Sequence, residues 1–363
     1  MSTVLAWATL AVWAGLALCH SWFWRTDQRL PELVRPERWP SVAIVVPARD
    51  EAGLLPETLP TLLRQSYPGD ARVIFVDDGS SDGTAEVARS LTVPNGLPLT
   101  VTSPGEPPDG WTGKLWAVAH GVREAGDVDF LLLTDADIAH APDSLEALVA
   151  TSGRDLVSQM AVLRTETFWE RLIVPAFVYF FAMLYPFRRV NSARWRTAAA
   201  AGGCVLVRRT ALERAGGIAA IRSAVIDDVA LARAVARASP QGGRIWLGYA
   251  SKVWSVRPYP RLADLWQMVA RSAYTQLRHS PLLLAGTVVG MIVVFLAPPV
   301  LALTGSWQAA VAWLLMAATF VPVARYYRQP LAAGLMLPFT AALYTLMTID
   351  SARRRTGWKG RTY

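Results

Sequence analysis

The stretch ARVIFVDDGSSDGT, residues 71–84, joins a short apolar run to an acidic, glycine-rich turn. The run Ala71–Val76 is rich in β-branched and aromatic residues, which favours a buried strand. The Asp, Gly and Ser residues that follow are typical of turns and helix N-caps. Residues 84–90 then continue as a predicted helix. This order of strand, turn and helix predicts one unit of an α/β fold.

The same unit is repeated on both sides of this stretch. Further strands are predicted at Ser41–Pro47, Leu97–Thr102 and Phe130–Thr134, and further helices at 54–66 and 113–124. Continuous apolar strands that alternate with helices predict a mainly parallel, Rossmann-like sheet covered on both faces. Ligands of such sheets bind at the carboxyl ends of the strands, so those ends are where we expect the site.

Carboxylates follow three of the predicted strands. Strand one ends in PARDE (47–51), the second in Asp77-Asp78 and the fourth in Asp135-Ala136-Asp137. Turn and capping roles explain part of this pattern, but not why like charges gather at one edge of the sheet. A bound cation would remove the repulsion. Alternate residues of an extended chain point the same way, and Mg²⁺ or Mn²⁺ takes carboxylate and phosphate oxygens, so Asp135 and Asp137 are candidate metal ligands.

Three motifs in this order and spacing, VVPARDE, DDGSSDGT and DAD, resemble the family 2 glycosyltransferases of the GT-A fold over about residues 40–280. The resemblance implies transfer of a sugar from a nucleotide-sugar, and UDP as the nucleotide. It implies that the nucleoside pocket is bordered by Pro47, Ala48, Asp50 and Glu51.

The same resemblance gives roles to the other acidic strand ends. Asp77, with its neighbour Asp78, would bind the uracil or ribose. Asp135 would face the ribose and diphosphate, and Asp137 would hold Mg²⁺ or Mn²⁺ on the diphosphate. Members of the family also carry a later acidic pair whose second residue is the catalytic base. Here that pair is Asp227-Asp228 before the helix ALARAVARA; capping of this helix is the alternative for both residues, and we interpret Asp228 as the base.

Two basic residues are candidates for the leaving diphosphate. Lys114 lies in PPDGWTGK, where a glycine-rich turn at a helix start can present N–H groups and a lysine to phosphate. The spacing of a P-loop is absent, and a surface lysine is the alternative. Arg271 lies in QMVARS, which departs from the Gln-x-x-Arg-Trp motif of processive synthases. The missing Trp favours transfer of a single sugar, and Arg271 is predicted to contact the diphosphate.

The composition places part of the chain in lipid. More than half of its residues are hydrophobic, and the mean hydropathy is +0.27. The apolar stretches 4–24, 282–304, 307–324 and 331–349 each approach the roughly 20 residues that cross a bilayer. We therefore predict an N-terminal anchor over 1–24, a transmembrane region over 282–349 and a basic tail over 350–363.

The net charge is +8, and clusters of basic residues flank these stretches. Basic residues at such positions mark the cytoplasmic side of a membrane and contact anionic lipid. A membrane protein with a cytoplasmic catalytic domain is therefore favoured over a nucleic-acid-binding protein. Three simple C-terminal spans would place the tail outside, so one segment is expected to be re-entrant or not to cross. Cys19 and Cys204 give no disulfide framework, and the scattered His residues give no zinc site.

The segment 168–187 is aromatic and apolar but is interrupted by charges and prolines, which favours a helix lying in the membrane interface over a buried core helix. Together with PPDGWTGKLWA, RSAYTQLRHSP and the terminal WKGRTY, this layout resembles the hopanoid-biosynthesis-associated glycosyltransferases. That resemblance implies a bacterial inner-membrane enzyme acting on a hopanoid or related polyterpenoid. The alternatives are a nucleotidyltransferase, which would want a basic loop where PARDEAG is acidic, and a non-enzymatic lipid-binding protein, which has no use for acidic strand ends.

Overall fold

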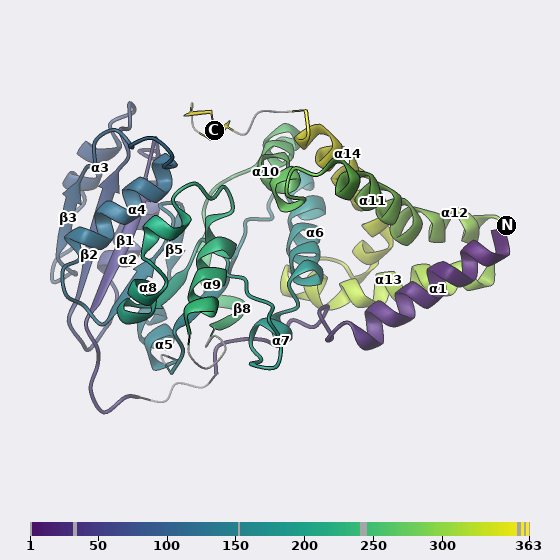
Figure 1. The fold of residues 1–363 in the computed structure, drawn as a ribbon, viewed down its shortest axis with the longest axis horizontal. Helices are drawn as coiled ribbons and strands as arrows, with labels where there is room; N and C mark the ends of the chain where they lie inside the picture. The colour runs from purple at the N-terminus through teal and green to yellow at the C-terminus, as the bar shows by residue number, and fades with distance from the viewer. Residues whose placement is uncertain are drawn as a thin grey trace. The chain divides into compact units, whose positions relative to one another are not determined.

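The computed structural model describes residues 2–31, 35–151, 153–239 and 245–353, with the backbone of 357–358 and 361–362. These residues form two compact units (Figure 1). The sheet unit consists of Gln28–Arg164 and Arg189–Pro258, and the helical unit of Met1–Asp27, Thr165–Arg188 and Tyr259–Tyr363. The predicted domain range of 40–280 differs from this division, because two of its segments, 165–188 and 259–280, group with the apolar helices.

The sheet unit is built on an eight-stranded sheet in the order β3-β2-β1-β4-β7-β6-β8-β5. The strands are β1 Val42–Ala48, β2 Ala71–Asp77, β3 Leu99–Thr102, β4 Phe130–Leu133, β5 Ile138–His140, β6 Leu156–Val162, β7 Val205–Arg208 and β8 Ile245–Ser255. The strands β3, β2, β1 and β4 run parallel to one another, and β6 runs parallel to β8. Strand β7 is antiparallel to both of its neighbours, β4 and β6, and the edge strand β5 is antiparallel to β8. The four predicted strands are confirmed as β1–β4; the sequence reading did not find the other four.

Helices cover both faces of the parallel strands. The helices of this unit are α2 Leu55–Leu63, α3 Thr84–Ser90, α4 Gly113–Glu124, α5 Ser144–Ala150, α8 Arg209–Arg214, η1 Ile218–Ile221 and α9 Asp227–Ala238. Ile44 of β1 belongs to one buried core with Leu59 of α2. Val45 points to the opposite face, where α4 approaches so closely that a Cβ on Gly121 would lie 2.5 Å from the Val45 Cγ1. Glycine is therefore required at position 121 for the helix to reach the sheet.

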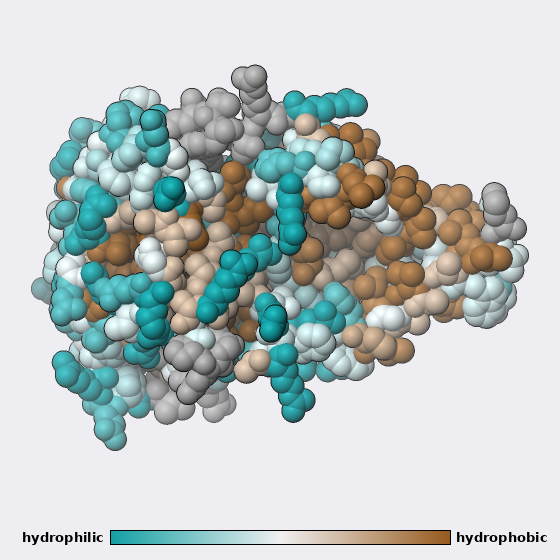
Figure 2. All heavy atoms as spheres, viewed as in Figure 1, coloured by the Kyte–Doolittle hydropathy of each residue, from teal (hydrophilic) through white to brown (hydrophobic). Residues whose placement is uncertain are grey.

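Among its described residues, the helical unit contains four segments that are long and apolar enough to cross a membrane: Ser2–Cys19, Pro281–Leu303, Trp307–Tyr326 and Leu331–Ser351. They comprise α1 Ser2–Cys19, α11 Pro281–Met291, a π-helical turn at Ile292–Leu296, α12 Ala297–Leu303, α13 Trp307–Tyr326, a 3₁₀ turn at Leu331–Met336 and α14 Leu337–Ser351. Figure 2 shows hydrophobic residues gathered over these helices. The four predicted apolar stretches are thus confirmed as helices. The remaining elements are α6 Phe168–Leu184, α7 Phe187–Val190, α10 Leu262–Gln276, β9 Gly357–Trp358 and β10 Arg361–Thr362.

Helix α6, which the sequence places in the membrane interface, packs one face inside the helical unit. Its Tyr179 is fully buried and its hydroxyl lies 2.7 Å from the Thr319 Oγ1 of α13. Thr167 and Glu170 form a capping box at its start, and the buried Glu170 carboxylate also accepts the Tyr259 N–H at 2.7 Å. Glu170, which looks in the sequence like a charge that interrupts an apolar segment, is therefore a structural cap. The place of α6 in a bilayer stays a prediction.

Candidate active site

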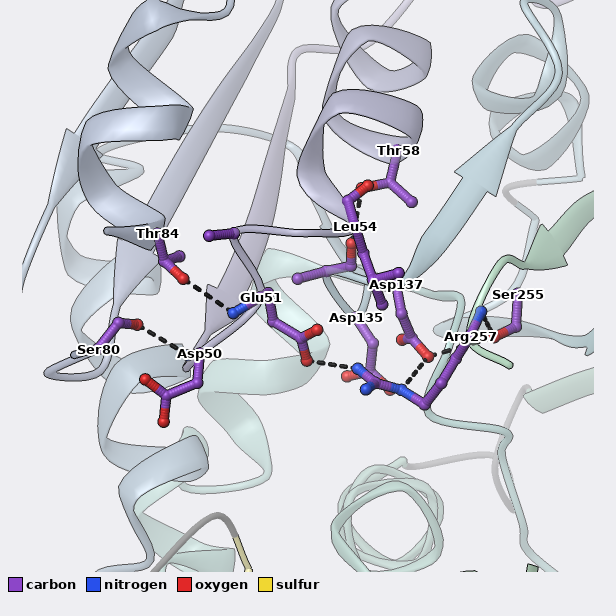
Figure 3. Close-up of polar contacts among 12 residues, drawn as sticks. Asp50, Glu51, Leu54, Thr58, Ser80, Thr84, Asp135, Asp137, Ser255 and Arg257 are labelled. Carbon is purple, nitrogen blue, oxygen red and sulfur yellow. Dashed lines mark hydrogen bonds and ion pairs between the residues drawn. The ribbon is translucent and has the colours of Figure 1, made fainter. Parts of the chain in front are cut away.

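The loops after β1 and β2 are hydrogen-bonded to each other. The Asp50 N–H donates to the Ser80 Oγ at 2.9 Å, and its carboxylate accepts the Ser81 N–H at 2.8 Å. The Glu51 N–H donates to the Thr84 Oγ1 at 2.8 Å, as Figure 3 shows. Asp50 has a φ of 51°, an uncommon value for a residue other than glycine, and these bonds hold it there. The first two acidic strand ends therefore meet, as the sequence predicts, and Asp50 organises the turn.

Asp77, the last residue of β2, is a largely buried carboxylate. Its side chain is only 9% exposed, and its Oδ2 accepts the Ser80 N–H at 3.3 Å. Among the described residues no donor reaches its Oδ1. A buried acceptor left unpaired costs free energy, so a donor on a bound ligand, such as a base N–H or a ribose hydroxyl, fits this position. The neighbouring Asp78 is buried, and its backbone carbonyl accepts from the Arg49 Nη1 at 2.8 Å.

Lys114 joins the end of β4 to the start of α9. Its Nζ lies 2.8 Å from the Asp135 Oδ1 and 3.0 Å from the Asp227 Oδ2. Burial lowers the pKa of Lys114, but the charges of the two carboxylates outweigh burial and raise it above its usual value. Burial raises the pKa of Asp135, Lys114 lowers it, and the charges of Asp137 and Asp227 raise it further, with a net upward shift. Lys114 is thus a fixed cation in the site rather than a surface lysine; its contact with a diphosphate stays a prediction.

Asp137 is held by residues at the end of β8. Its Oδ2 accepts from the Arg257 Nε at 2.8 Å and from the Ser255 Oγ at 3.2 Å. The Arg257 Nη2 also pairs with the Glu51 Oε1, so that the guanidinium lies between the two carboxylates (Figure 3). Arg257 was not predicted as a site residue, because the strand β8 that precedes it was not predicted. The signal was present in the apolar run IWLGYASKVWS, residues 245–255, which ends two residues before Arg257.

Asp135 and Asp137 fit a hard divalent cation by the chemistry of their donors. Both are carboxylates, and each has an oxygen besides the one that contacts a basic side chain. Within the described ranges no three His, Cys, Asp or Glu side chains gather into a metal site. A cation here would therefore bind through one or two carboxylates and complete its shell with substrate phosphates and water, as Mg²⁺ commonly does.

Asp228 lines a small cavity, of about 30 Å³, together with some of the residues predicted to bind the substrate. The cavity is lined among others by Pro47, Lys114, Asp135, Gly202, Asp227 and Asp228. The Asp228 Oδ2 accepts the Gly202 N–H at 2.9 Å and its Oδ1 accepts the Val229 N–H at 2.7 Å. Burial, followed by the charge of Asp227, raises the pKa of Asp228 to about 7. A carboxylate that titrates near neutral pH is suited to accept a proton during a reaction.

Two further predicted residues lie on β1 and α10. Ala48 is buried at the end of β1, 2% exposed. Arg271 is exposed on α10 and belongs to the helical unit, so its contact with a diphosphate stays a prediction.

Comparison with known proteins finds similarity to glycosyltransferases over part of the chain. Residues 43–216 match the model of the family described as Glycosyl transferase family 2. The 4,4'-diaponeurosporenoate glycosyltransferase of Staphylococcus aureus (strain bovine RF122 / ET3-1) is 35% identical over 111 residues, which are 30% of this chain and 27% of that protein. The enzyme of the same name from Staphylococcus haemolyticus (strain JCSC1435) is 31% identical over 115 residues, 31% of this chain and 29% of that one. The matches therefore span less than a third of these relatives.

Among solved structures, the mannosyltransferase PcManGT from Pyrobaculum calidifontis, in complex with GDP-Man and Mn²⁺, is similar over 99% of this chain and 100% of its own, with a TM-score of 0.58 and 22% identity. At this identity the likeness concerns the fold. The chain thus has a GT-A fold together with apolar helices, and its residues 43–216 are similar to the glycosyltransferase family 2 model.

Proposed function

We propose that this protein is an inverting glycosyltransferase that moves one sugar from a nucleoside diphosphate sugar, with UDP as the first choice of nucleotide, to a hydroxyl of a membrane lipid. The observation that carries the proposal is the cavity in which Asp228, with a pKa of about 7, lies beside the Lys114 pair with Asp135 and Asp227. This arrangement supplies a base and a fixed cation to one reaction centre.

In the proposed reaction the acceptor hydroxyl forms a bond to the anomeric carbon of the sugar while the bond from that carbon to the diphosphate breaks. Asp228 takes the proton of the hydroxyl. Attack comes from the face opposite the leaving group, so the configuration inverts. The diphosphate departs with its electron pair, and Lys114 stabilises the negative charge that develops on it. The Asp77 Oδ1 accepts a hydrogen bond from the nucleoside and thereby orients the donor.

Asp135 and Asp137 are the residues that would hold Mg²⁺ or Mn²⁺, and the cation, when bound, supplies positive charge to the leaving diphosphate.

The lipid acceptor and the membrane location rest on the helical unit and the relatives. The four apolar helices support a multi-pass protein of the bacterial inner membrane, and the basic flanks of the apolar stretches support a cytoplasmic catalytic domain. The Staphylococcus relatives are named for a 4,4'-diaponeurosporenoate substrate. With the resemblance to hopanoid-associated enzymes, this favours a hopanoid or a related polyterpenoid as the acceptor.

The experiment is to incubate the purified full-length protein with Mn²⁺ or Mg²⁺, hopanoid alcohols and a panel of UDP- and GDP-sugars, and to weigh the lipid product by mass spectrometry. We expect the lipid to gain one sugar, a nucleoside diphosphate to be released, and EDTA to stop the reaction. Release of pyrophosphate would show a nucleotidyltransferase instead. Failure to bind any sugar nucleotide in the presence of metal would leave lipid binding without catalysis.

A further inference from the structure

Arg257 connects two carboxylates that the proposed function assigns to different ligands. Glu51 borders the predicted nucleoside pocket, and Asp137 is the predicted metal ligand. The Arg257 Nε lies 2.8 Å from the Asp137 Oδ2, and its Nη2 pairs with the Glu51 Oε1. Glu51 is 7% exposed, so its charge needs a partner inside the protein.

The backbone around Arg257 is held in place independently of its side chain. The Val256 N–H donates to the Asp137 carbonyl at 3.0 Å, and the Arg257 N–H donates to the Ser255 Oγ at 3.3 Å. The end of β8 therefore stays beside the Asp-Ala-Asp segment whichever partner the guanidinium takes. Only the long, flexible side chain has to move for the contact with Asp137 to change.

A guanidinium and a divalent cation compete for the same carboxylate. Each is stabilised by the negative charge of Asp137, and repulsion between two nearby cations disfavours their joint binding to one carboxylate, even at its two different oxygens. Planar guanidinium groups also bind phosphate with two hydrogen bonds. A guanidinium that leaves Asp137 can therefore bind the diphosphate of a nucleotide.

We infer that Arg257 is the internal counter-ion of the cation site. It neutralises Asp137 and Glu51 while the site is empty, it leaves Asp137 when a divalent cation binds there, and its guanidinium then pairs with the diphosphate of the donor. This inference rests on the proposed function for the identity of the diphosphate. The exchange on Asp137 itself concerns only the cation.

The test measures Mn²⁺ binding to the full-length protein in detergent without nucleotide, by calorimetry or by the spin-resonance signal of free Mn²⁺, and then UDP binding with Mn²⁺ saturating. Arg257→Met keeps the length of the side chain but removes its charge. We expect it to bind Mn²⁺ at least about tenfold more tightly, because a neighbouring charge changes the affinity of a carboxylate for a cation by this order. UDP should bind at least about tenfold more weakly, because a hydrogen-bonded charge is lost.

Lys252→Met is the matched control. Lys252 lies on β8, the strand that precedes Arg257, and its Nζ pairs with the Asp143 Oδ2 rather than with Asp137, so the variant loses the same charge without changing a contact of the cation site. Both affinities should stay unchanged in it. Arg257→Lys, which keeps the charge but not the planar fork, should bind Mn²⁺ like the wild type and UDP more weakly.

Unchanged or weaker Mn²⁺ binding by folded Arg257→Met would overturn the inference and make Arg257 a purely structural residue. If Arg257→Met does not fold, Arg257→Lys decides the matter, since undiminished UDP affinity in that variant would overturn the inference. Tighter Mn²⁺ binding in a protein that transfers no sugar would refute the proposed function and retain the exchange on Asp137.

Discussion

Replacement of Asp228 by Asn should abolish turnover and at the same time stabilise the protein at alkaline pH. Loss of a general base typically costs 10²–10⁴-fold in rate, so we expect a decrease of about this size. Burial and Asp227 raise the pKa of Asp228 from 3.8 to about 7. A shift of this size means that keeping Asp228 ionised inside the folded protein costs about 4 kcal/mol at most.

The sign of the stability effect follows from proton binding. Between pH 4 and pH 7 the folded protein holds a proton on Asp228 that the unfolded chain has released, so the free energy of unfolding falls as the pH rises through this window. Asn carries no charge and avoids this loss. It forgoes one of the two backbone hydrogen bonds that Asp228 accepts, at about 1 kcal/mol. The expected net gain is thus about 2–3 kcal/mol at pH 8 and close to zero at pH 5.

The assay combines sugar transfer with thermal unfolding in detergent at the two pH values. In the wild type, kcat/KM should rise with pH through about 7, because only the ionised carboxylate accepts the proton. Asp228→Asn should still bind the nucleotide-sugar, whereas Asp137→Ala, the contrasting variant, should lose turnover and bind the donor weakly. Turnover by Asp228→Asn within tenfold of the wild type, or an equal gain in Tm at both pH values, would refute the assignment.

Two further substitutions test the donor site and the sheet. Asp77→Ala removes the buried Oδ1, which no donor reaches among the described residues, and the 3.3 Å hydrogen bond that Oδ2 accepts from Ser80. The free protein should therefore lose little in Tm, while its Kd for UDP, measured by calorimetry, rises about tenfold or more. An unchanged Kd would place the nucleoside elsewhere. Gly121→Ala would bring a Cβ within 2.5 Å of the Val45 Cγ1 and 2.9 Å of the Val76 Cγ2, and should cost about 1–3 kcal/mol in denaturant unfolding, with nucleotide affinity retained in the fraction that folds. Wild-type stability of Gly121→Ala would contradict the close packing of α4 on the sheet.

The parallel half of the sheet and the apolar helices were predictable because their signals are local. Each of β1 to β4 is a short apolar run followed by a polar turn, and each candidate span is a long apolar run. Parallel strands present their carboxyl ends to one edge of a sheet, and this rule predicts from the sequence alone that Asp50, Asp77 and Asp135 lie in one region. The cap formed by Thr167 and Glu170 also has a local T-x-x-E signal, but it was not predicted, because Glu170 was interpreted as a charge that interrupts an apolar segment.

What the sequence alone determined is therefore the repeated strand-and-helix order, the acidic strand ends and the apolar helices, all of which follow from neighbours along the chain. Only the tertiary structure decided which charges meet. Arg257 reaches Glu51 across 206 residues, and Asp228 is held by Gly202 across 26. Such pairs form because the fold brings distant strands and loops together. The sequence on either side of each residue does not indicate which residue it will contact. The burial that raises the pKa of Asp228 likewise comes from the packed chain around it.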